Sequence, residues 1–209
     1  PAVQTIGPSA IPINNSSPVP KEMTVEDINK VREDFKKAAQ RADKAGFDII
    51  EIHGAHGYLL HSFFSPLSNQ RNDQYGGSFE NRIRFALEII ADIKSVWPDN
   101  KPLFYRLSSI DAPGQGANLE DNIMLAKSLK SVGVDVIDCS SGGITGSPVL
   151  TKSKIIPGFQ VPYSEKIKKD AEISSMAVGA IISADQANEI IANKRADLVA
   201  MGRELLADT

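Results

Sequence analysis

The chain has 209 residues, of which 42% are hydrophobic and 23% are charged, so it is no disordered protein and can bury a large core. The net charge of −3 and the scattered Lys and Arg residues give no basic stripe, and we expect no nucleic-acid partner. Its one cysteine, Cys139, allows no internal disulfide, and no apolar run is long enough to span a bilayer. These features predict a cytoplasmic protein without a membrane partner.

Predicted helices and strands alternate along the chain after a lead-in, 1–23, that is rich in Pro and Ser. Apolar residues at helical spacing predict a helix over 24–46, with Thr24 as its N-cap. The isoleucine-rich segment 47–53 predicts a buried strand, and a long polar loop separates it from the next helix. The later elements are predicted as helix 78–98, strand 102–108, helix 118–133, strand 134–140, helix 163–172, strand 174–181, helix 183–194 and strand 196–202.

Strand–helix units in series predict a parallel sheet, either open or closed into a barrel. We favour a barrel because no G-x-G-x-x-G follows any strand and because reactive residues directly follow the strands, where a (β/α)8 barrel has its active site. Only about five units are present, whereas a full barrel has eight and about 250 residues. We therefore predict one α/β domain, 1–209, with serial units over 24–209, that forms the later part of a (β/α)8 TIM barrel. The absence of an initiator Met fits a processed, tagged or excised chain.

A faint internal repeat supports the serial organisation. The segments AGFDIIEIHG, VGVDVIDCSS and KRADLVAMGR each place an Asp before aliphatic residues. We expect Asp48, Asp135 and Asp197 to be solvated turn residues between a helix and the next strand. Ser183 and Gln186 have the spacing of a capping box at the last predicted helix.

Several residues that follow the predicted strands are candidates for a ligand site. Barrels often bind phosphate after their last two strands, where glycines allow close backbone approach and an arginine adds a charged donor. Gly179, Gly202 and Arg203 are at such places. Arg106 would point from its strand toward the middle of the same ligand, although an ion pair with a helix carboxylate is the alternative.

The segment HGAHGYL, 53–59, leaves three interpretations open. His53 and His56 could bind a metal, but no Glu lies between them as in H-E-x-x-H, and carboxylates from elsewhere would be needed. Two imidazole N–H groups could instead converge on a carbonyl or phenolate oxygen, with Tyr58 as a neutral acid. Packing alone is the third interpretation. We expect the remaining histidine, His61, to be structural.

Longer stretches of the chain resemble a known family. GFDIIEIHGAHGYLLHSFFSPLSNQRNDQYGGSFENR, followed in order by YRLS, DCSSGG, PGFQVPYSEKI, AVG and ADLVAMGRELL, closely resembles the old yellow enzyme family of FMN-dependent ene-reductases. Within that family the chain is most similar to the bacterial NADPH dehydrogenase and xenobiotic reductase branch. The resemblance extends from GPSAIP to the end of the chain.

The resemblance implies an FMN-dependent oxidoreductase that transfers hydride from NADPH or NADH through FMN to the alkene of an α,β-unsaturated carbonyl compound. A small enone or a phenol would be the ligand, and the branch commonly forms homo-oligomers. The implied substrate-binding residues are His53 and His56, on the carbonyl oxygen, and Tyr58, as the proton donor. The implied cofactor-binding residues are Arg106 beside the flavin N1 and C2 carbonyl, and Gly179, Gly202 and Arg203 at the FMN phosphate.

The chain also departs from the family pattern, because the first three strands and their flavin contacts are not found in it. Two alternatives therefore stay open: a metal-dependent barrel hydrolase that uses His53 and His56, or a non-catalytic truncated barrel module. The segment NQRNDQYGGSFENR, 69–82, contains no obvious catalytic atom. We expect its polar residues to tie the long loop to the following helix.

Overall fold

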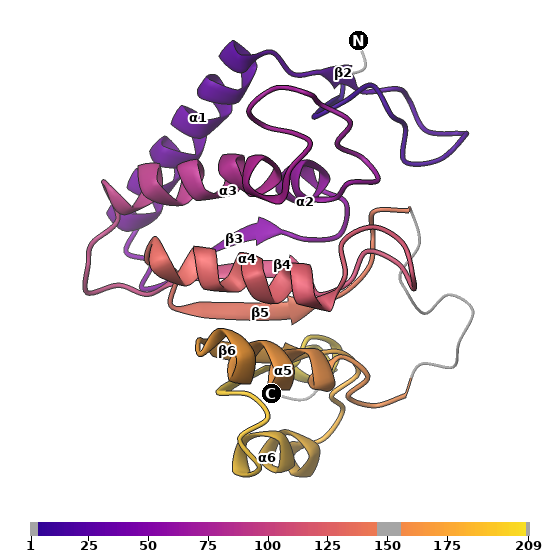
Figure 1. Ribbon diagram of the computed structural model, residues 1–209. Coiled ribbons are helices and arrows are strands. Elements are labelled where there is room, and N and C mark those ends of the chain that lie inside the picture. Colours follow the sequence, from indigo (N-terminus) through magenta and orange to yellow (C-terminus); the bar gives the residue numbers. More distant parts are fainter. Residues whose placement is uncertain (1–3, 146–155, 208–209) are drawn as a thin grey trace.

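The computed structural model describes residues 4–145 and 156–207, and its centre is a five-stranded parallel sheet (Figure 1). The strands follow one another in chain order: β3 (Ile50–Gly54), β4 (Leu103–Ser108), β5 (Val136–Ser140), β6 (Ser174–Val178) and β7 (Leu198–Ala200). The helices are α1 (Val25–Lys44), α2 (Leu59–Phe64), α3 (Phe79–Lys94), α4 (Leu119–Ser131), α5 (Val161–Ala171), α6 (Ala184–Ala192) and α7 (Arg203–Ala207). Two short strands of the lead-in, β1 (Ile6–Gly7) and β2 (Lys21–Glu22), pair with each other. The predicted series of strand–helix units is therefore confirmed.

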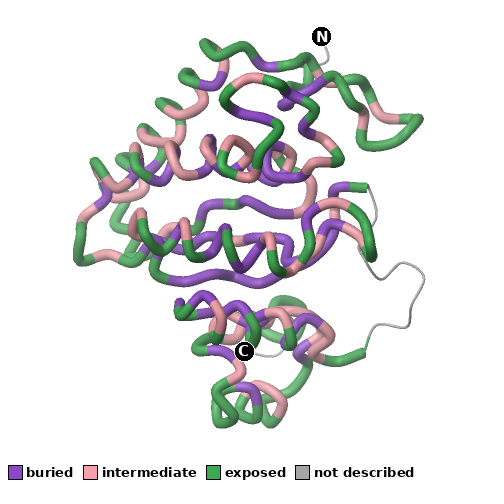
Figure 2. The backbone as a smooth tube through the Cα atoms, viewed as in Figure 1, coloured by how far each residue is buried: buried purple, intermediate pink, exposed green. Residues whose placement is uncertain are grey.

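The two faces of the sheet differ because successive strand residues point to opposite sides. On one face, Ile52, Tyr105 and Ile137 join the main core, to which α1, α3, α4 and α5 contribute buried apolar side chains. These four helices pack against each other in chain order. Figure 2 shows β5 buried along its whole length, whereas β3 at the edge of the sheet alternates between buried and exposed residues. The other face bears His53 and Arg106.

Some predicted boundaries are wrong, and the structure gives the reasons. The strand predicted at 47–53 begins only at Ile50, because pairing with β4 begins there, opposite Leu103. Phe47 and Ile49 remain 59% and 45% exposed. The polar loop predicted after this strand contains α2, whose Leu60, Phe63 and Phe64 are buried in the core.

Helix caps mostly follow the sequence. Thr24 caps α1 in a complete capping box: its hydroxyl accepts from the N–H of Asp27, and the Asp27 carboxylate accepts from the N–H of Thr24. The box predicted for α6 is only half formed. The Ser183 hydroxyl accepts from the backbone N–H of Gln186, but the Gln186 side chain accepts instead from the N–H of Ile182.

The polar segment after α2 ties the long loop to α3, as predicted, since Asn81 donates to the carbonyl of Gly76. It also contacts α2 and the lead-in. The buried Asn69 amide donates to the carbonyls of Phe63 and Tyr75, and Arg82 donates to the carbonyl of Phe64. Arg71 donates to the carbonyls of Pro8 and Met23 and so attaches the lead-in. Among the described residues no helix has the length and apolar character to cross a membrane.

Two aspartates of the internal repeat have a role that the sequence prediction missed. The N–H of Asp135 donates to the carbonyl of Leu103, while its carboxylate accepts from the Leu103 N–H at 2.8 Å. Asp197 makes the same pair of bonds with Ser175, with 3.0 Å to the Ser175 N–H. Each aspartate thus fixes the start of the preceding strand, rather than being only a solvated turn residue. No such bond to the Asp48 carboxylate is found within 4–145 and 156–207.

We predict that Asp135→Ala lowers the free energy of unfolding by about 1–2 kcal/mol, because the Leu103 N–H loses its acceptor. Urea unfolding followed by circular dichroism measures the change. Asp48→Ala is the matched control from the same repeat and should stay within about 0.5 kcal/mol of the parent. Equal losses in the two variants would contradict the assigned bond.

Candidate active site

A row of polar side chains crosses three neighbouring strands on the face away from the helices. In the parallel register, His53 of β3 is opposite Arg106 of β4, and Arg106 is opposite Asp138 of β5. Because paired residues in a sheet point to the same side, all three side chains lie on one face. Strand pairing therefore brings two predicted site residues, His53 and Arg106, next to each other.

The turn after β3 has an unusual backbone that other elements hold in place. His56 and Gly57 have φ angles of 58° and 77°, both in the left-handed region. For a residue other than glycine this costs on the order of 1–3 kcal/mol and persists only when the surroundings enforce it. The N–H of His56 donates to the Ser108 hydroxyl at 3.0 Å, which in turn donates to the carbonyl of Gly142. A Cβ on Gly143 would lie 2.3 Å from the His56 Cα, so the loop after β5 packs directly on the turn.

The His56 ring is fixed and neutral. Its Nε2 lies 2.6 Å from the Ser140 hydroxyl oxygen at the end of β5. Burial, together with the charges of Arg106 and the other histidines, lowers the pKa of His56 to about 4. The pKa of His53 is also lowered, first by partial burial and then by Arg106. Both imidazoles are therefore neutral at pH 7 and can each donate one N–H.

The three predicted substrate-binding residues lie together. The ring centroid of His53 is 5.2 Å from that of His56 and 5.2 Å from that of Tyr58. Tyr58 is the N-cap residue of α2 and is 64% exposed. Two neutral donors and one phenol thus border the same open space at the end of β3.

Arg106 is paired with a strand carboxylate and not with a helix carboxylate, which was the alternative from the sequence. Its Nε lies 3.2 Å from Oδ2 of Asp138, although the N–H is not aligned for a hydrogen bond. Burial raises the pKa of Asp138 to about 7, with Arg106 opposing the shift and Glu51 adding to it. No hydrogen bond from the terminal nitrogens of Arg106 is present among the described residues, so that edge of the guanidinium can contact a ligand.

The predicted phosphate residues lie at the ends of two paired strands. Gly179 follows β6, and Gly202 and Arg203 follow β7, its neighbour in the sheet. A Cβ on Gly202 would meet no atom within 4 Å, which leaves room for an anion. Gly179 is needed for another reason: its φ is 122°, and a Cβ there would lie 2.8 Å from Nε2 of Gln160. Arg203 has no ion-pair partner in the described part of the chain.

The sequence places Ser108, Ser140 and Ser141 at the ends of predicted strands, but it gave no role to these serines, to Asp138 or to Gln160, which support the site. Ser108, Ser140 and Asp138 contact its turn, its imidazole and its guanidinium. The buried Gln160 accepts from the Ser141 hydroxyl and donates to the carbonyl of Val178, and so links the ends of β5 and β6. The serines and Asp138 follow or lie in predicted strands, and this position is the signal that could have identified them.

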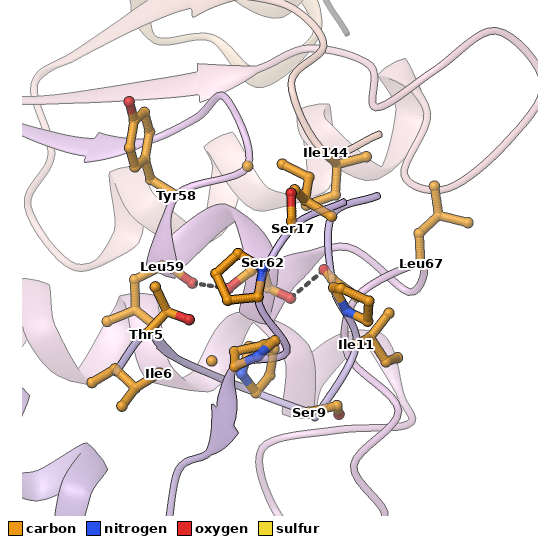
Figure 3. A pocket seen from close by; sticks show the side chains of 18 of the residues that line it. Thr5, Ile6, Ser9, Ile11, Ser17, Tyr58, Leu59, Ser62, Leu67 and Ile144 are labelled. Atoms are coloured by element: carbon orange, nitrogen blue, oxygen red, sulfur yellow. Dashed lines mark hydrogen bonds between the residues drawn. The ribbon is translucent and has the colours of Figure 1, made fainter. Parts of the chain in front are cut away.

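A cavity of about 810 Å³ lies beside the polar row and not on it. The lead-in and the residues around α2 line it, mostly with apolar side chains. Figure 3 shows Tyr58 at the edge of this group, with its hydroxyl oxygen away from the other labelled side chains. His53, His56 and Arg106 do not line the cavity. It therefore adjoins the site at Gly57 and Tyr58 of the turn.

The described residues do not group three His, Cys, Asp or Glu side chains in a way that could hold a metal ion. Within 4–145 and 156–207, His53 and His56 thus have no third protein ligand of the kind that a catalytic zinc site uses.

Comparison with known proteins identifies the family. The chain matches, over residues 3–209, the model of the NADH:flavin oxidoreductase / NADH oxidase family. It is 51% identical over 201 residues to an NADPH dehydrogenase of Bacillus velezensis, an alignment that covers 96% of this chain and 58% of that relative. The chain thus spans less than two thirds of the length of this relative. These descriptions support the predicted enzyme class, with FMN as cofactor and NAD(P)H as reductant.

Solved structures agree with this match. A complex of 2-naphthoyl-CoA reductase with 2-naphthoyl-CoA superposes with a TM-score of 0.90 at 28% identity, covering 98% of this chain and 32% of that one. Morphinone reductase in complex with tetrahydroNAD gives a TM-score of 0.76 at 26% identity, covering 98% and 57%. The predicted architecture, an incomplete (β/α)8 barrel, is confirmed. As the resemblance to old yellow enzyme implied, the chain belongs to the NADH:flavin oxidoreductase / NADH oxidase family.

Proposed function

We propose that this chain provides the substrate-binding and part of the flavin-binding surface of an FMN-dependent oxidoreductase that reduces the alkene of α,β-unsaturated carbonyl compounds. The observation that supports this most is the pairing of His53 with Arg106 on adjacent strands. It places an oxygen-binding imidazole beside a cation suited to an anionic ring. FMN, when bound, supplies the hydride that it has received from NAD(P)H.

His53 and His56 bind the carbonyl oxygen of the substrate in this proposal. Both imidazoles are neutral, so each can donate one N–H to an oxygen on which negative charge develops. For His56 to donate from Nδ1, its Nε2 must accept the proton of the Ser140 hydroxyl, 2.6 Å away. Tyr58, exposed beside His53, gives its phenolic proton to the carbon next to the carbonyl.

The residues that would hold FMN fit that group at two places. Arg106 lies on the same face as His53 and would stabilise negative charge near N1 and the C2 carbonyl of the flavin. At the other end, the open space at Gly202 and the exposed Arg203 accept the phosphate, with Gly179 on the neighbouring strand. A cation suited to the flavin ring at one end and an anion site at the other support FMN as the ligand, rather than a flavin without phosphate.

Other properties remain predictions for the whole protein. They are a single domain over 1–209, a cytoplasmic location, homo-oligomers, and an enone or a phenol as the ligand. The identity of the reductant, NADPH or NADH, is also a property of the whole protein.

We predict that His53→Ala weakens the binding of phenol by about 10-fold or more, because one charge-stabilising donor is lost. The content of bound FMN should remain nearly that of the parent, since His53 donates to the substrate. Calorimetric titration with phenol measures the first quantity, and the visible absorbance of the purified protein measures the second. Loss of flavin in this variant would argue against the assigned role.

The low pKa of His56 predicts a pH dependence of stability. Its folded value of about 4 lies below the ordinary value of 6.5, so the unfolded chain takes up this proton first as the pH falls. The stabilisation from a neutral His56 is present above about pH 6.5 and is lost progressively between pH 6.5 and pH 4. His56→Asn, which tolerates the left-handed backbone, should therefore lose less melting temperature over this range than the parent. Parallel curves for the two proteins would contradict the neutral imidazole.

A further inference from the structure

The third histidine touches the substrate-binding turn directly. Gly57 lies between His56 and Tyr58, and its N–H donates to Nδ1 of His61 at 2.9 Å. His61 is on α2 and is 1% exposed. Its imidazole therefore contacts the backbone of the turn from the protein interior.

Hydrogen bonding sets the tautomer of His61. A backbone N–H can only donate, so Nδ1 has a lone pair and Nε2 has the proton. That proton is directed to Oδ1 of Asp111 at 2.7 Å. The other carboxylate oxygen accepts from the Ser65 hydroxyl at 2.5 Å and from the N–H of Ala117 at 2.7 Å. With Asp111 fully buried, the chain of bonds from Asp111 through His61 to Gly57 is rigid and excludes water.

The turn needs such support because two successive residues are left-handed. One of the two N–H groups, that of His56, is held by Ser108 from β4. The other, that of Gly57, is held by His61, and no second acceptor for it lies within the described part of the chain. Without this acceptor the peptide between His56 and Gly57 can rotate. That peptide is attached to the Cα of His56, and Tyr58 follows it after Gly57.

We propose that His61 and Asp111 are positioning residues, which hold the turn so that His56 and Tyr58 face one substrate oxygen and the adjacent carbon. This inference rests on the proposed function for the roles of His56 and Tyr58. It goes beyond the structural role that the sequence predicts for His61, because the buried His61–Asp111 pair would then affect the affinity for substrate.

Two substitutions of His61 separate positioning from stability. In His61→Asn, the side-chain oxygen takes the place of Nδ1 and still accepts from Gly57, but the donor to Asp111 is lost. In His61→Gln, the side-chain amide nitrogen takes the place of Nε2 and still donates to Asp111, but the acceptor for Gly57 is lost. Ser62→Ala, on the same helix, is the control for general disturbance of α2.

We expect His61→Gln to weaken phenol binding about 10-fold and to accelerate hydrogen exchange of the Gly57 amide by a similar factor, with little change in melting temperature. His61→Asn should lower the melting temperature while keeping both the phenol affinity and the Gly57 exchange near those of the parent. Calorimetry and NMR measure these quantities. Ser62→Ala should leave the exchange of Gly57 unchanged.

The proposal would be overturned if, in both variants, phenol affinity fell only in proportion to the fall in melting temperature. Unchanged hydrogen exchange of the Gly57 amide in His61→Gln would overturn it as well. If His61→Asn does not fold, the comparison of His61→Gln with the parent decides alone. A parent chain that binds no phenol contradicts the proposed function. The exchange of Gly57, which requires neither flavin nor phenol, then still decides whether His61 holds the turn.

Discussion

The parallel pairing of β3, β4 and β5 is the constraint on which the site depends. One register places His53, Arg106 and Asp138 in a row and at the same time directs Ile52, Tyr105 and Ile137 to the helices. A shift by one residue would bury the charges and expose the core. The hydrophobic effect that stabilises the sheet therefore also fixes the polar row, and no separate interaction is needed to bring its members together.

Around this row, the structure places neutral imidazoles next to a charged guanidinium. His56 is held neutral by partial burial next to the charge of Arg106, and Arg106 is kept beside Asp138. Neutral donors suit an oxygen that gains negative charge, and a permanent cation suits an anionic ring. Two serine hydroxyls hold His56 in place. Ser108, at the end of β4, binds its backbone N–H, and Ser140, at the end of β5, binds its ring.

Most of the fold could be predicted from the sequence, because the apolar periodicity of each strand and helix is local. The grouping of His53, His56 and Tyr58 could be predicted too, since they follow one strand. The roles of Asp135 and His61 could not, because their partners Leu103 and Asp111 are distant in sequence. The helix α2 was missed since its six residues are too few to show a period, and its burial depends on the tertiary fold.

The central claim is that the ends of β4, β6 and β7 form a flavin site with a phosphate end. Equilibrium titration of the purified chain with FMN and with riboflavin, followed by flavin fluorescence, tests it most directly. We predict that FMN binds about 10-fold or more tightly than riboflavin, and that Arg203→Ala removes this difference while leaving riboflavin binding unchanged. Arg195→Ala, at the opposite end of β7 and paired with Glu165, should leave the difference intact. Equal affinity for the two flavins, or no binding of either, would contradict the account.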